Sequence, residues 1–292
     1  MQVIKDYKEM TRGEKMNLVD AIDNRVSVRT YQNKQISNDD IIKIKSILSN
    51  HKKKKGPFDH SFDLTFNINS ANGTDGKRIG TYGVLKNVPA FIGGVCQNTT
   101  ESIIDFGYVF EHIILNFTAQ GFGTCWLGGT FKRRNYRKVL EDTEVIPAIS
   151  PIGYIAPKRS LVEKLMRNGA KSDNRLPFND LFVDSHLNPL TAGLREDITN
   201  CLRMVRKAPS ASNKQPWRVI VDDDKKYFHF YMARTKNYAS PLKYDIQALD
   251  IGIALAHFEI GLEYYGINFT REKLELHPFK AGWEYTISLK LS

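Results

Sequence analysis

The chain has 292 residues, of which 41% are hydrophobic and 25% are charged, and its 42 Lys and Arg against 32 Asp and Glu give a net charge of +10. This composition is typical of a globular protein with a sizeable core, and no run of about 18 apolar residues indicates a membrane span. Three widely spaced cysteines predict neither a disulfide framework nor a metal cluster. The first residues lack the apolar core of a signal peptide, so we expect a cytoplasmic protein.

The excess of positive charge is spread along the chain, with one short run at residues 52–55. Such a run is most often a solvated basic face. The alternative is a surface that attracts anionic small molecules such as phosphorylated cofactors. We expect neither a nucleic-acid nor a membrane partner, because the sequence shows no helix-turn-helix, zinc-finger or RNA-recognition pattern and no membrane span.

In chain order, the first half of the sequence predicts an amphipathic helix over residues 41–48 and a strand over 62–66. A long apolar helix follows and closes on Gly121, because glycine is a common helix stop. We expect this helix to be buried, since it is apolar on more than one side. Residues 149–155 predict the last strand of this half.

The second half of the sequence repeats this order. It predicts a helix over 198–205, strands over 219–221 and 228–231, a second long apolar helix that closes on a glycine, and a last strand over 285–289. Four residues of the long helices recur 145 positions apart, namely Asp105 and Asp250, Gly107 and Gly252, His112 and His257, and Gly121 and Gly266. The repetition predicts two tandem α+β units, 15–166 and 191–292, joined by a polar linker over 167–190.

Two polar segments have the character of ligand-binding loops. In Ala208–Trp217, small hydroxyl and amide side chains follow a proline and end in Gln-Pro-Trp, which predicts a rigid, non-periodic loop. The second segment, Arg25-Val26-Ser27-Val28-Arg29-Thr30-Tyr31, lies near the opposite end of the chain. If both segments serve one site, they must meet in space.

Each unit retains only one of these two segments. Aligning Pro57-Phe58 with Pro216-Trp217 puts the lysine run of unit one in the place of the Pro-Ser-Ala-Ser-Asn segment of unit two. The Arg-x-Ser-x-Arg segment has no counterpart before Leu194. The two halves of the signature are therefore divided between the units.

These segments, together with Gly121–Gly129 and Pro151–Tyr154, resemble the FMN-dependent nitroreductase family. Typical members are homodimers that bind FMN between their subunits. The displaced Pro-Ser loop resembles the fused tandem-repeat subfamily, the TM nitroreductases. The resemblance implies an α+β, nitroreductase-like fold in which two units form a single-chain pseudo-dimer, each unit a mixed, mainly antiparallel sheet packed with helices. It also implies one FMN per chain, while further association of the chains stays open.

The resemblance also implies roles for individual residues. Arg25 and Ser27 would hold the phosphate and ribityl end of FMN, with Lys158 or Arg159 assisting. Arg29 would lie near the N1/O2 edge of the flavin ring, where positive charge stabilises the reduced form. The backbone of Trp126-Leu127-Gly128-Gly129 would pass beside the ring and direct an N–H at N5. The loop of unit two would complete the pocket through Pro209, Ser210, Ser212, Asn213 and Gln215.

Each of these assignments has a structural alternative. Arg25 and Arg29 would otherwise be surface residues, and the glycine pair an ordinary turn after a helix. Trp217 is expected to anchor its loop in the core. His112 and His257 are expected to be structural and Cys125 a packed residue, so no side chain is assigned as catalytic. Asn72 and Tyr82 are candidates for gating the substrate.

The resemblance implies an enzyme that reduces nitroaromatics, quinones or related electron-poor small molecules. NADH or NADPH would deliver hydride to flavin N5 and leave before the oxidant enters, which is a ping-pong reaction. The sequence has no Gly-x-Gly-x-x-Gly motif, in keeping with a transient nicotinamide. The alternatives are an FMN-binding or flavin-storage protein without nicotinamide-dependent turnover, and a basic interaction protein without a cofactor.

Overall fold

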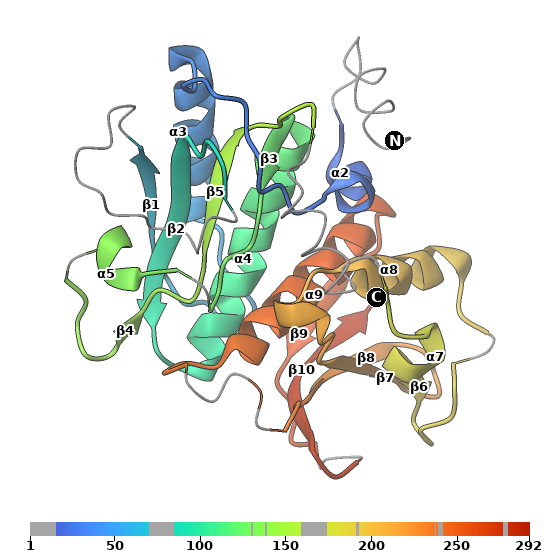
Figure 1. The fold of residues 1–292 in the computed structure, drawn as a ribbon. Helices are drawn as coiled ribbons and strands as arrows, with labels where there is room; N and C mark the ends of the chain where they lie inside the picture. The colour runs from blue at the N-terminus through green and yellow to red at the C-terminus, as the bar shows by residue number, and fades with distance from the viewer. Residues whose placement is uncertain are drawn as a thin grey trace.

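Two five-stranded sheets lie on either side of a central pair of long helices (Figure 1). The computed structural model describes residues 16–69, 85–129, 131–137, 139–158, 174–190, 193–236, 238, 242–276 and 280–292. The first half of the chain forms α2 (Leu18–Asn24), α3 (Asn38–Lys52), β1 (Asp63–Ile68), β2 (Ala90–Gln97), α4 (Thr100–Ala119), β3 (Phe122–Thr124), α5 (Arg133–Tyr136), β4 (Glu144–Val145) and β5 (Ile149–Tyr154). The second half forms α7 (Phe178–Leu181), β6 (Phe182–Asp184), α8 (Glu196–Lys207), η1 (Ala211–Asn213), β7 (Trp217–Val221), β8 (Tyr227–Ala233), α9 (Ile246–Tyr264), β9 (Phe269–Glu272) and β10 (Trp283–Leu291).

The first sheet has the order β1-β2-β5-β3, with β4 paired to β2, and the second has the order β6-β7-β8-β10-β9. When β4 and β6 are left out, the four remaining strands of each sheet follow the same order. Apart from the β6–β7 pair, which is parallel, neighbouring strands are antiparallel. The structure is thus an α+β fold with mixed, mainly antiparallel sheets, and it contains each helix and strand that the sequence predicts.

The predicted linker over 167–190 is wrong in its second part. Residues 178–184 form α7 and β6, and β6 pairs with β7 as an edge strand of the second sheet. Strand β6 was hidden in the sequence because it is only three residues long and follows a polar stretch. Residues 174–190 therefore belong with the second sheet.

The predicted match of Pro57-Phe58 with Pro216-Trp217 is also wrong. The amide of Phe58 donates to Asp105 Oδ1 at 2.8 Å, and the amide of Ala211 donates to Asp250 Oδ1 at 2.9 Å. Since Asp105 and Asp250 are the repeated helix residues, Phe58 corresponds to Ala211. The place of the polar loop is thus taken in the first half by residues 56–60, and the lysines lie before it.

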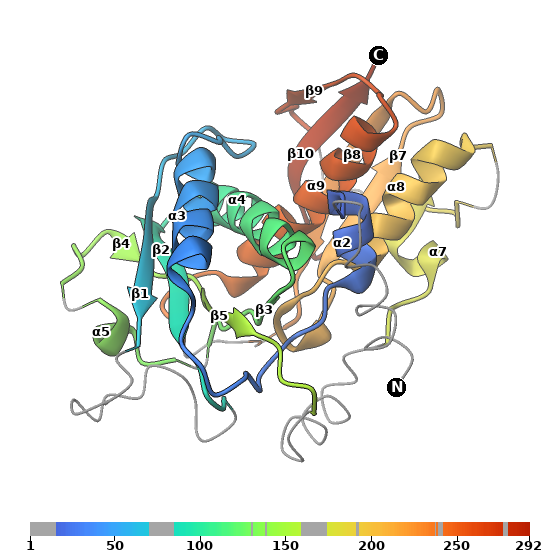
Figure 2. The same cartoon turned by 90° about the horizontal axis from the view of Figure 1, so that it is seen from above.

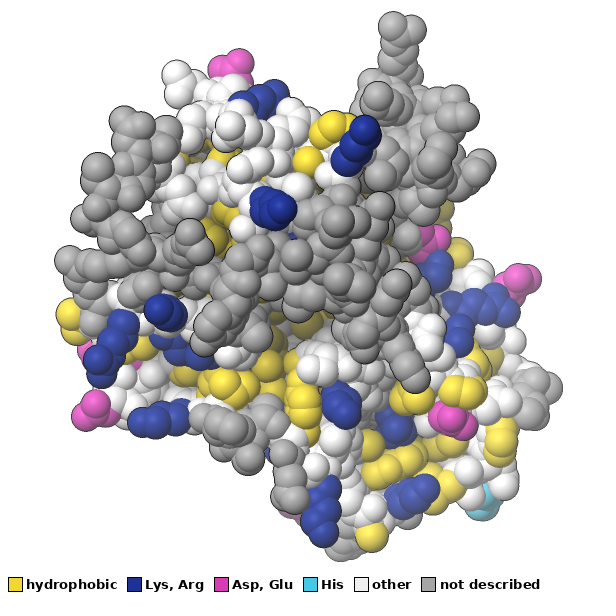
Figure 3. Space-filling model, viewed as in Figure 1, with side chains coloured by type: hydrophobic (Ala, Val, Ile, Leu, Met, Phe, Trp, Pro, Cys, Tyr) yellow, Lys and Arg dark blue, Asp and Glu magenta, His cyan; other side chains and the backbone are white. Residues whose placement is uncertain are grey.

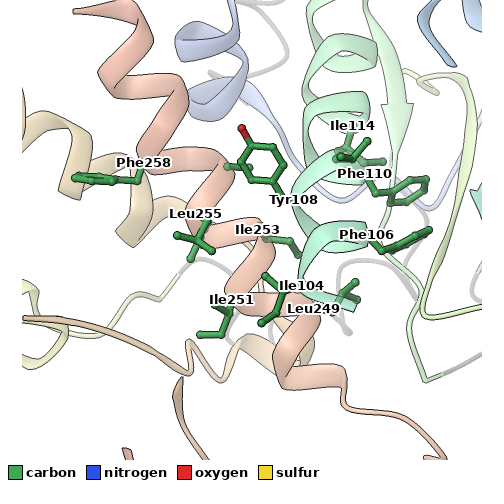
Figure 4. Packing of buried hydrophobic residues seen from close by; sticks show 14 of the residues in the cluster. Ile104, Phe106, Tyr108, Phe110, Ile114, Leu249, Ile251, Ile253, Leu255 and Phe258 are labelled. Carbon is green, nitrogen blue, oxygen red and sulfur yellow. The ribbon is translucent and has the colours of Figure 1, made fainter. Parts of the chain in front are cut away.

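Helices α4 and α9 form the centre of the core. Both are mostly apolar and are buried on all sides over most of their length, which is typical of central helices. Ile104, Leu249 and Ile253 lie between the two helices, whereas Phe106 and Phe110 point from α4 away from α9 (Figure 4). No helix in the described ranges meets the length and hydrophobicity that crossing a membrane requires.

The described part of the surface carries dispersed positive charge. On the face shown in Figure 3, Lys and Arg side chains lie over both halves of the molecule and are separated by residues of other types. Such a distribution is typical of a solvated basic face rather than one concentrated binding patch.

Two glycines allow the close approach of α4 and α9. A Cβ atom at Gly252 would lie 2.0 Å from the Ile104 carbonyl oxygen, and one at Gly107 would lie 2.3 Å from the Leu249 carbonyl oxygen. Residues 104 and 249 are themselves 145 positions apart, as are 107 and 252. The contact is therefore reciprocal, each helix offering the same glycine to the same backbone position of the other.

We predict that Gly252→Ala destabilises the chain by about 3 kcal/mol, because the added methyl group forces two backbones apart. The free energy of unfolding in urea measures the effect. Glu263→Ala is the matched control, since Glu263 is exposed on the same helix, and it is expected to change stability by less than about 0.5 kcal/mol. Equal stability of Gly252→Ala and the unsubstituted chain would contradict the close contact.

Candidate functional site

Helix α2 brings the Arg25 segment next to the loop that follows α8. It packs against α4, α8 and α9, and Figure 2 shows it between the two halves of the molecule. Asp23 near its end forms an ion pair with Lys207, the last residue of α8. Arg25 lies two residues after Asp23, and Pro209 lies two residues after Lys207. The two ligand-like segments of the sequence therefore start side by side.

The Arg25 segment is an extended strip beside β3. Val28 donates its amide to the Thr124 carbonyl at 2.8 Å, and the hydroxyl of Tyr31 donates to the Val28 carbonyl at 2.8 Å. Val28 and Tyr31 are buried, whereas Arg25, Ser27 and Arg29 are partly exposed. The three residues singled out in the sequence are therefore among the accessible ones of this strip.

Three buried polar atoms at this strip have no hydrogen-bond partner among the described residues. They are Nη1 of Arg25, Nη1 of Arg29 and Oγ1 of Thr124, whose residue bridges to Ser27. A buried donor without an acceptor is costly, and most of all on a cation. A phosphate or another anion would supply the missing acceptors, since guanidinium groups bind phosphate through charge-assisted hydrogen bonds. The residues present therefore fit a phosphorylated cofactor.

Lys158 and Arg159 were predicted to assist with the phosphate. Lys158 is exposed and lies two residues after Ala156, whose amide donates to the Thr30 carbonyl at 3.2 Å. Arg159 lies outside the described residues, as do Asn72 and Tyr82, the residues proposed to gate the substrate.

The segment from Trp126 to Gly129 is fixed from three sides. The indole N–H of Trp126 donates to Glu111 Oε2 at 2.7 Å, and Leu127 exchanges two backbone hydrogen bonds with Ile149. A Cβ at Gly128 would lie 2.7 Å from Ile246 Cδ1. The glycine pair therefore lies against the start of α9, in the second half of the chain.

The loop Pro209–Gln215 has a strained backbone. Ser212, Asn213 and Gln215 have φ values of 48°, 55° and 51°, in the left-handed region that glycine favours. Non-glycine residues adopt such values where surrounding contacts impose them, and they cluster at sites that clamp ligands. The loop thus has the backbone of a functional segment.

Some polar side chains of this loop hold it together, and others are exposed. Gln215 is buried, and its backbone amide donates to Ser210 Oγ. Its side-chain Oε1 accepts from the Leu176 amide and its Nε2 donates to the Asn213 carbonyl, so Gln215 holds the loop together. Asn213 Nδ2 donates to the Asn174 carbonyl. Ser212 is exposed, and its hydroxyl accepts from the hydroxyl of Tyr238 at 2.9 Å. Trp217 is fully buried, as predicted for the anchor of the loop.

Sequence reasoning missed a further segment that contacts the site, the connection between β8 and α9, which forms one wall of it. The connection from β2 to α4 has two residues, whereas the connection from β8 to α9 runs over residues 234–245. Three of its described residues contact the site: Tyr238 contacts Ser212, the Leu242 side chain lies 3.7 Å from a Cβ built at Gly129, and Tyr244 lies beside Gly128. The unequal spacing between the last strand residue and the repeated helix Asp was the signal that would have revealed it.

The repeated aspartates differ in their environment. Asp105 accepts from the Phe58 amide, the His60 amide and His60 Nδ1. Asp250 accepts from the Ala211 amide, and its second oxygen is buried without a partner among the described residues. Burial raises the pKa of Asp250 well above its ordinary value of 3.8. Asp250, which holds the strained loop, is therefore harder to ionise than an exposed carboxyl group.

This raised pKa predicts the pH dependence of an Asp250→Asn variant. A carboxyl whose pKa is raised by folding stabilises the folded state fully below its unfolded pKa, and this stabilisation is lost as pH rises toward the folded pKa. Asn does not titrate, so the stability of the variant relative to the unsubstituted chain should increase from pH 4 to pH 7. Urea unfolding across this range measures it, and a difference that stays constant with pH would contradict the raised pKa of Asp250.

Within the described ranges, no group of three or more His, Cys, Asp or Glu side chains is arranged to hold a metal ion. Cys96, Cys125 and Cys201 are buried. The two repeated histidines are buried as well, and only His257 has hydrogen bonds on both ring nitrogens. The candidate site is therefore built from the Arg25 strip, the Trp126–Gly129 segment and the loop beyond α8.

The fold and this pair of segments define a nitroreductase-like protein, and comparison with known proteins identifies the family. Residues 17–262 match the family model described as "Putative TM nitroreductase". The chain belongs to this nitroreductase family. Its α+β fold and a general role as an oxidoreductase follow from that membership.

A solved structure shares the fold over almost the whole chain. A crystal structure of a nitroreductase from Thermotoga maritima MSB8 is matched over 96% of this chain and 96% of that chain, with 22% identity and a TM-score of 0.61. An FMN-dependent nitroreductase from Clostridium difficile R20291 is matched over 48% of this chain and 89% of that chain, with 18% identity and a TM-score of 0.35. A nitroreductase family protein from Clostridium novyi NT has 19% identity and a TM-score of 0.37, over 49% and 87% of the two chains. No curated protein matches the sequence.

Proposed function

We propose that the chain is an FMN-dependent NAD(P)H oxidoreductase that reduces nitroaromatics, quinones or related electron-poor small molecules. The observation that carries this proposal is the pair of buried guanidinium nitrogens, Arg25 Nη1 and Arg29 Nη1, which have no acceptor among the described residues. They belong to a strip that starts beside the strained loop Pro209–Gln215. An anionic cofactor that contacts both segments explains both features.

We further propose that the chain is a single-chain pseudo-dimer of two nitroreductase-like units. The shared strand order, the reciprocal glycines at Gly107 and Gly252, and the aspartates that each hold a loop support this organisation. A two-fold dimer interface places the same surface on both partners. The contact between α4 and α9 has this property within one polypeptide.

In the proposed site, residues of both units hold FMN. Arg25 and Ser27, with Lys158, would bind the phosphate and ribityl chain, and Arg29 would place positive charge at the N1/O2 edge of the ring. Gly128 and Gly129 would let the backbone approach the ring closely. Bound FMN supplies hydride acceptance from NADH or NADPH and hydride donation to the oxidant. Tyr238 and Leu242 would form the wall beside which both substrates enter in turn.

The pseudo-dimer has a second place where a loop of the first half meets the second half, and we propose that this place is closed. Residues 56–60 occupy the place of the polar loop, and Arg271 Nη1 donates to the Gly56 carbonyl at 3.3 Å. The Lys273 ammonium lies 5.6 Å from the ring centre of Phe58. We propose that these contacts leave no room for a second flavin, so we expect one FMN per chain.

A titration with FMN and a nicotinamide tests the proposal. The purified chain reconstituted with FMN is expected to be yellow, to bind close to one FMN per chain, and to lose its flavin absorbance when NADH or NADPH is added without oxygen. Adding a quinone should restore the absorbance. A flavin that binds but is not reduced by either nicotinamide would favour flavin storage, and a chain that binds no FMN would overturn the proposal.

Substituting one arginine tests the site itself. Arg25→Gln should weaken FMN binding roughly 30-fold, because it removes a charge-assisted hydrogen bond to the phosphate. Riboflavin, which lacks the phosphate, should bind the variant and the unsubstituted chain equally well. Arg195→Gln is the matched control, since Arg195 is exposed and pairs only with nearby Asp197. If both arginine variants bind FMN like the unsubstituted chain, Arg25 does not hold the phosphate.

A further inference from the structure

Two carboxylates lie in the centre of the core, Glu111 on α4 and Glu259 on α9. Both side chains are fully buried. A buried carboxylate is tolerated only when its oxygens are paired. Each carboxylate is paired with one residue of the opposite long helix. Each is also paired with one residue in, or just after, an edge strand of its own half, so the two clusters have the same plan.

The Glu111 cluster joins the segment after β3 to α9. Glu111 Oε2 accepts from the Trp126 indole, and Glu111 Oε1 lies 2.9 Å from His257 Nε2. His257 Nδ1 lies 2.9 Å from the Met204 carbonyl, which only accepts, so Nδ1 carries a proton. A single proton then lies between His257 Nε2 and Glu111 Oε1, and Oε2 stays an acceptor for the indole wherever that proton resides.

The Glu259 cluster has a different chemistry at the matching position. Arg271 binds Glu259 through two hydrogen bonds of 2.8 and 2.6 Å, and the Tyr108 hydroxyl donates to Glu259 Oε2 at 2.6 Å. Trp126 and Arg271 are 145 positions apart, the spacing of the repeated helix residues. At this one position the first half, which supplies the proposed flavin segment Trp126–Gly129, has an indole. The second half has a guanidinium there.

We propose that Glu111 is a positioning residue for the flavin, which rests on the proposed FMN site. Its hydrogen bond fixes the Trp126 ring, which also packs 4.9 Å from the Phe110 ring, and thereby fixes the backbone of Gly128 and Gly129. His257 ties the same carboxylate to α9. Because α9 also holds the loop Pro209–Gln215 through Asp250, both halves of the site are aligned to one helix.

Variants of the two buried carboxylates test this role through FMN affinity. Glu111→Met leaves the Trp126 N–H without an acceptor and should weaken FMN binding about tenfold. Glu111→Gln keeps an acceptor at the same place and should bind FMN within about twofold of the unsubstituted chain. Glu259→Met is the matched control, because it removes an equally buried carboxylate from the other cluster, and its FMN affinity should also stay within about twofold.

The hydrogen bond can also be followed without FMN. In the ¹⁵N-tryptophan-labelled chain, the indole N–H signal of Trp126, assigned with Trp126→Phe, should shift in Glu111→Met while those of Trp217 and Trp283 stay in place. If Glu111→Met does not fold, Trp126→Phe removes the same bond and should show the same loss of FMN affinity. If Glu259→Met does not fold, Tyr108→Phe serves as the control.

The outcomes separate this inference from the proposed function. A chain that binds no FMN before substitution overturns the proposed function. A chain that binds FMN, and binds it equally well with Glu111→Met, overturns only the positioning role. An equal loss of affinity in Glu111→Met and Glu259→Met would show that both act through general stability, and it would also overturn the positioning role.

Discussion

The close packing of α4 against α9 is the contact on which the rest of the structure depends. Gly107 and Gly252 let each helix touch the backbone of the other, and the two sheets lie on either side of this pair (Figure 1). A side chain at either glycine would have to displace a main chain, which a close-packed interior resists. The relative position of the two halves, and of any site between them, is thus fixed by a backbone contact rather than by adaptable side chains.

Polar groups buried around this contact connect it to the site. Glu111 and His257 lie between the long helices and reach Trp126, while Asp250 reaches the loop beyond α8. Such groups have few alternative partners in an apolar interior, so each specifies one arrangement of the segments that it joins. The proposed cofactor segments of the two halves are therefore aligned through α9, although they are far apart in the sequence.

Much of the fold could be predicted from the sequence, because the long apolar helices and the alternating strands have strong periodic patterns. Strand β2 was missed because Gly93-Gly94 is typical of a turn, whereas in the structure a Cβ at Gly94 would lie 2.8 Å from the Asp63 carbonyl oxygen of the neighbouring strand. The pairing of Phe58 with Trp217 failed for a related reason. The match was based on a proline followed by an aromatic residue in both halves. The correspondence in the structure depends on the hydrogen bonds to Asp105 and Asp250, which the sequence does not display.

The sequence by itself determined that two α+β halves share one plan, that an Arg-x-Ser-x-Arg strip occurs in one and a polar loop in the other, and that the nitroreductase family is the one they resemble. These are local patterns, and periodicity and residue type express them directly. Only the tertiary structure decided which loop residues face outward, that Tyr238, Leu242 and Tyr244 contact the candidate site, and that a buried glutamate holds Trp126. These properties depend on which side chains remain without a partner once the helices have packed, and pairing of that kind exists only in three dimensions.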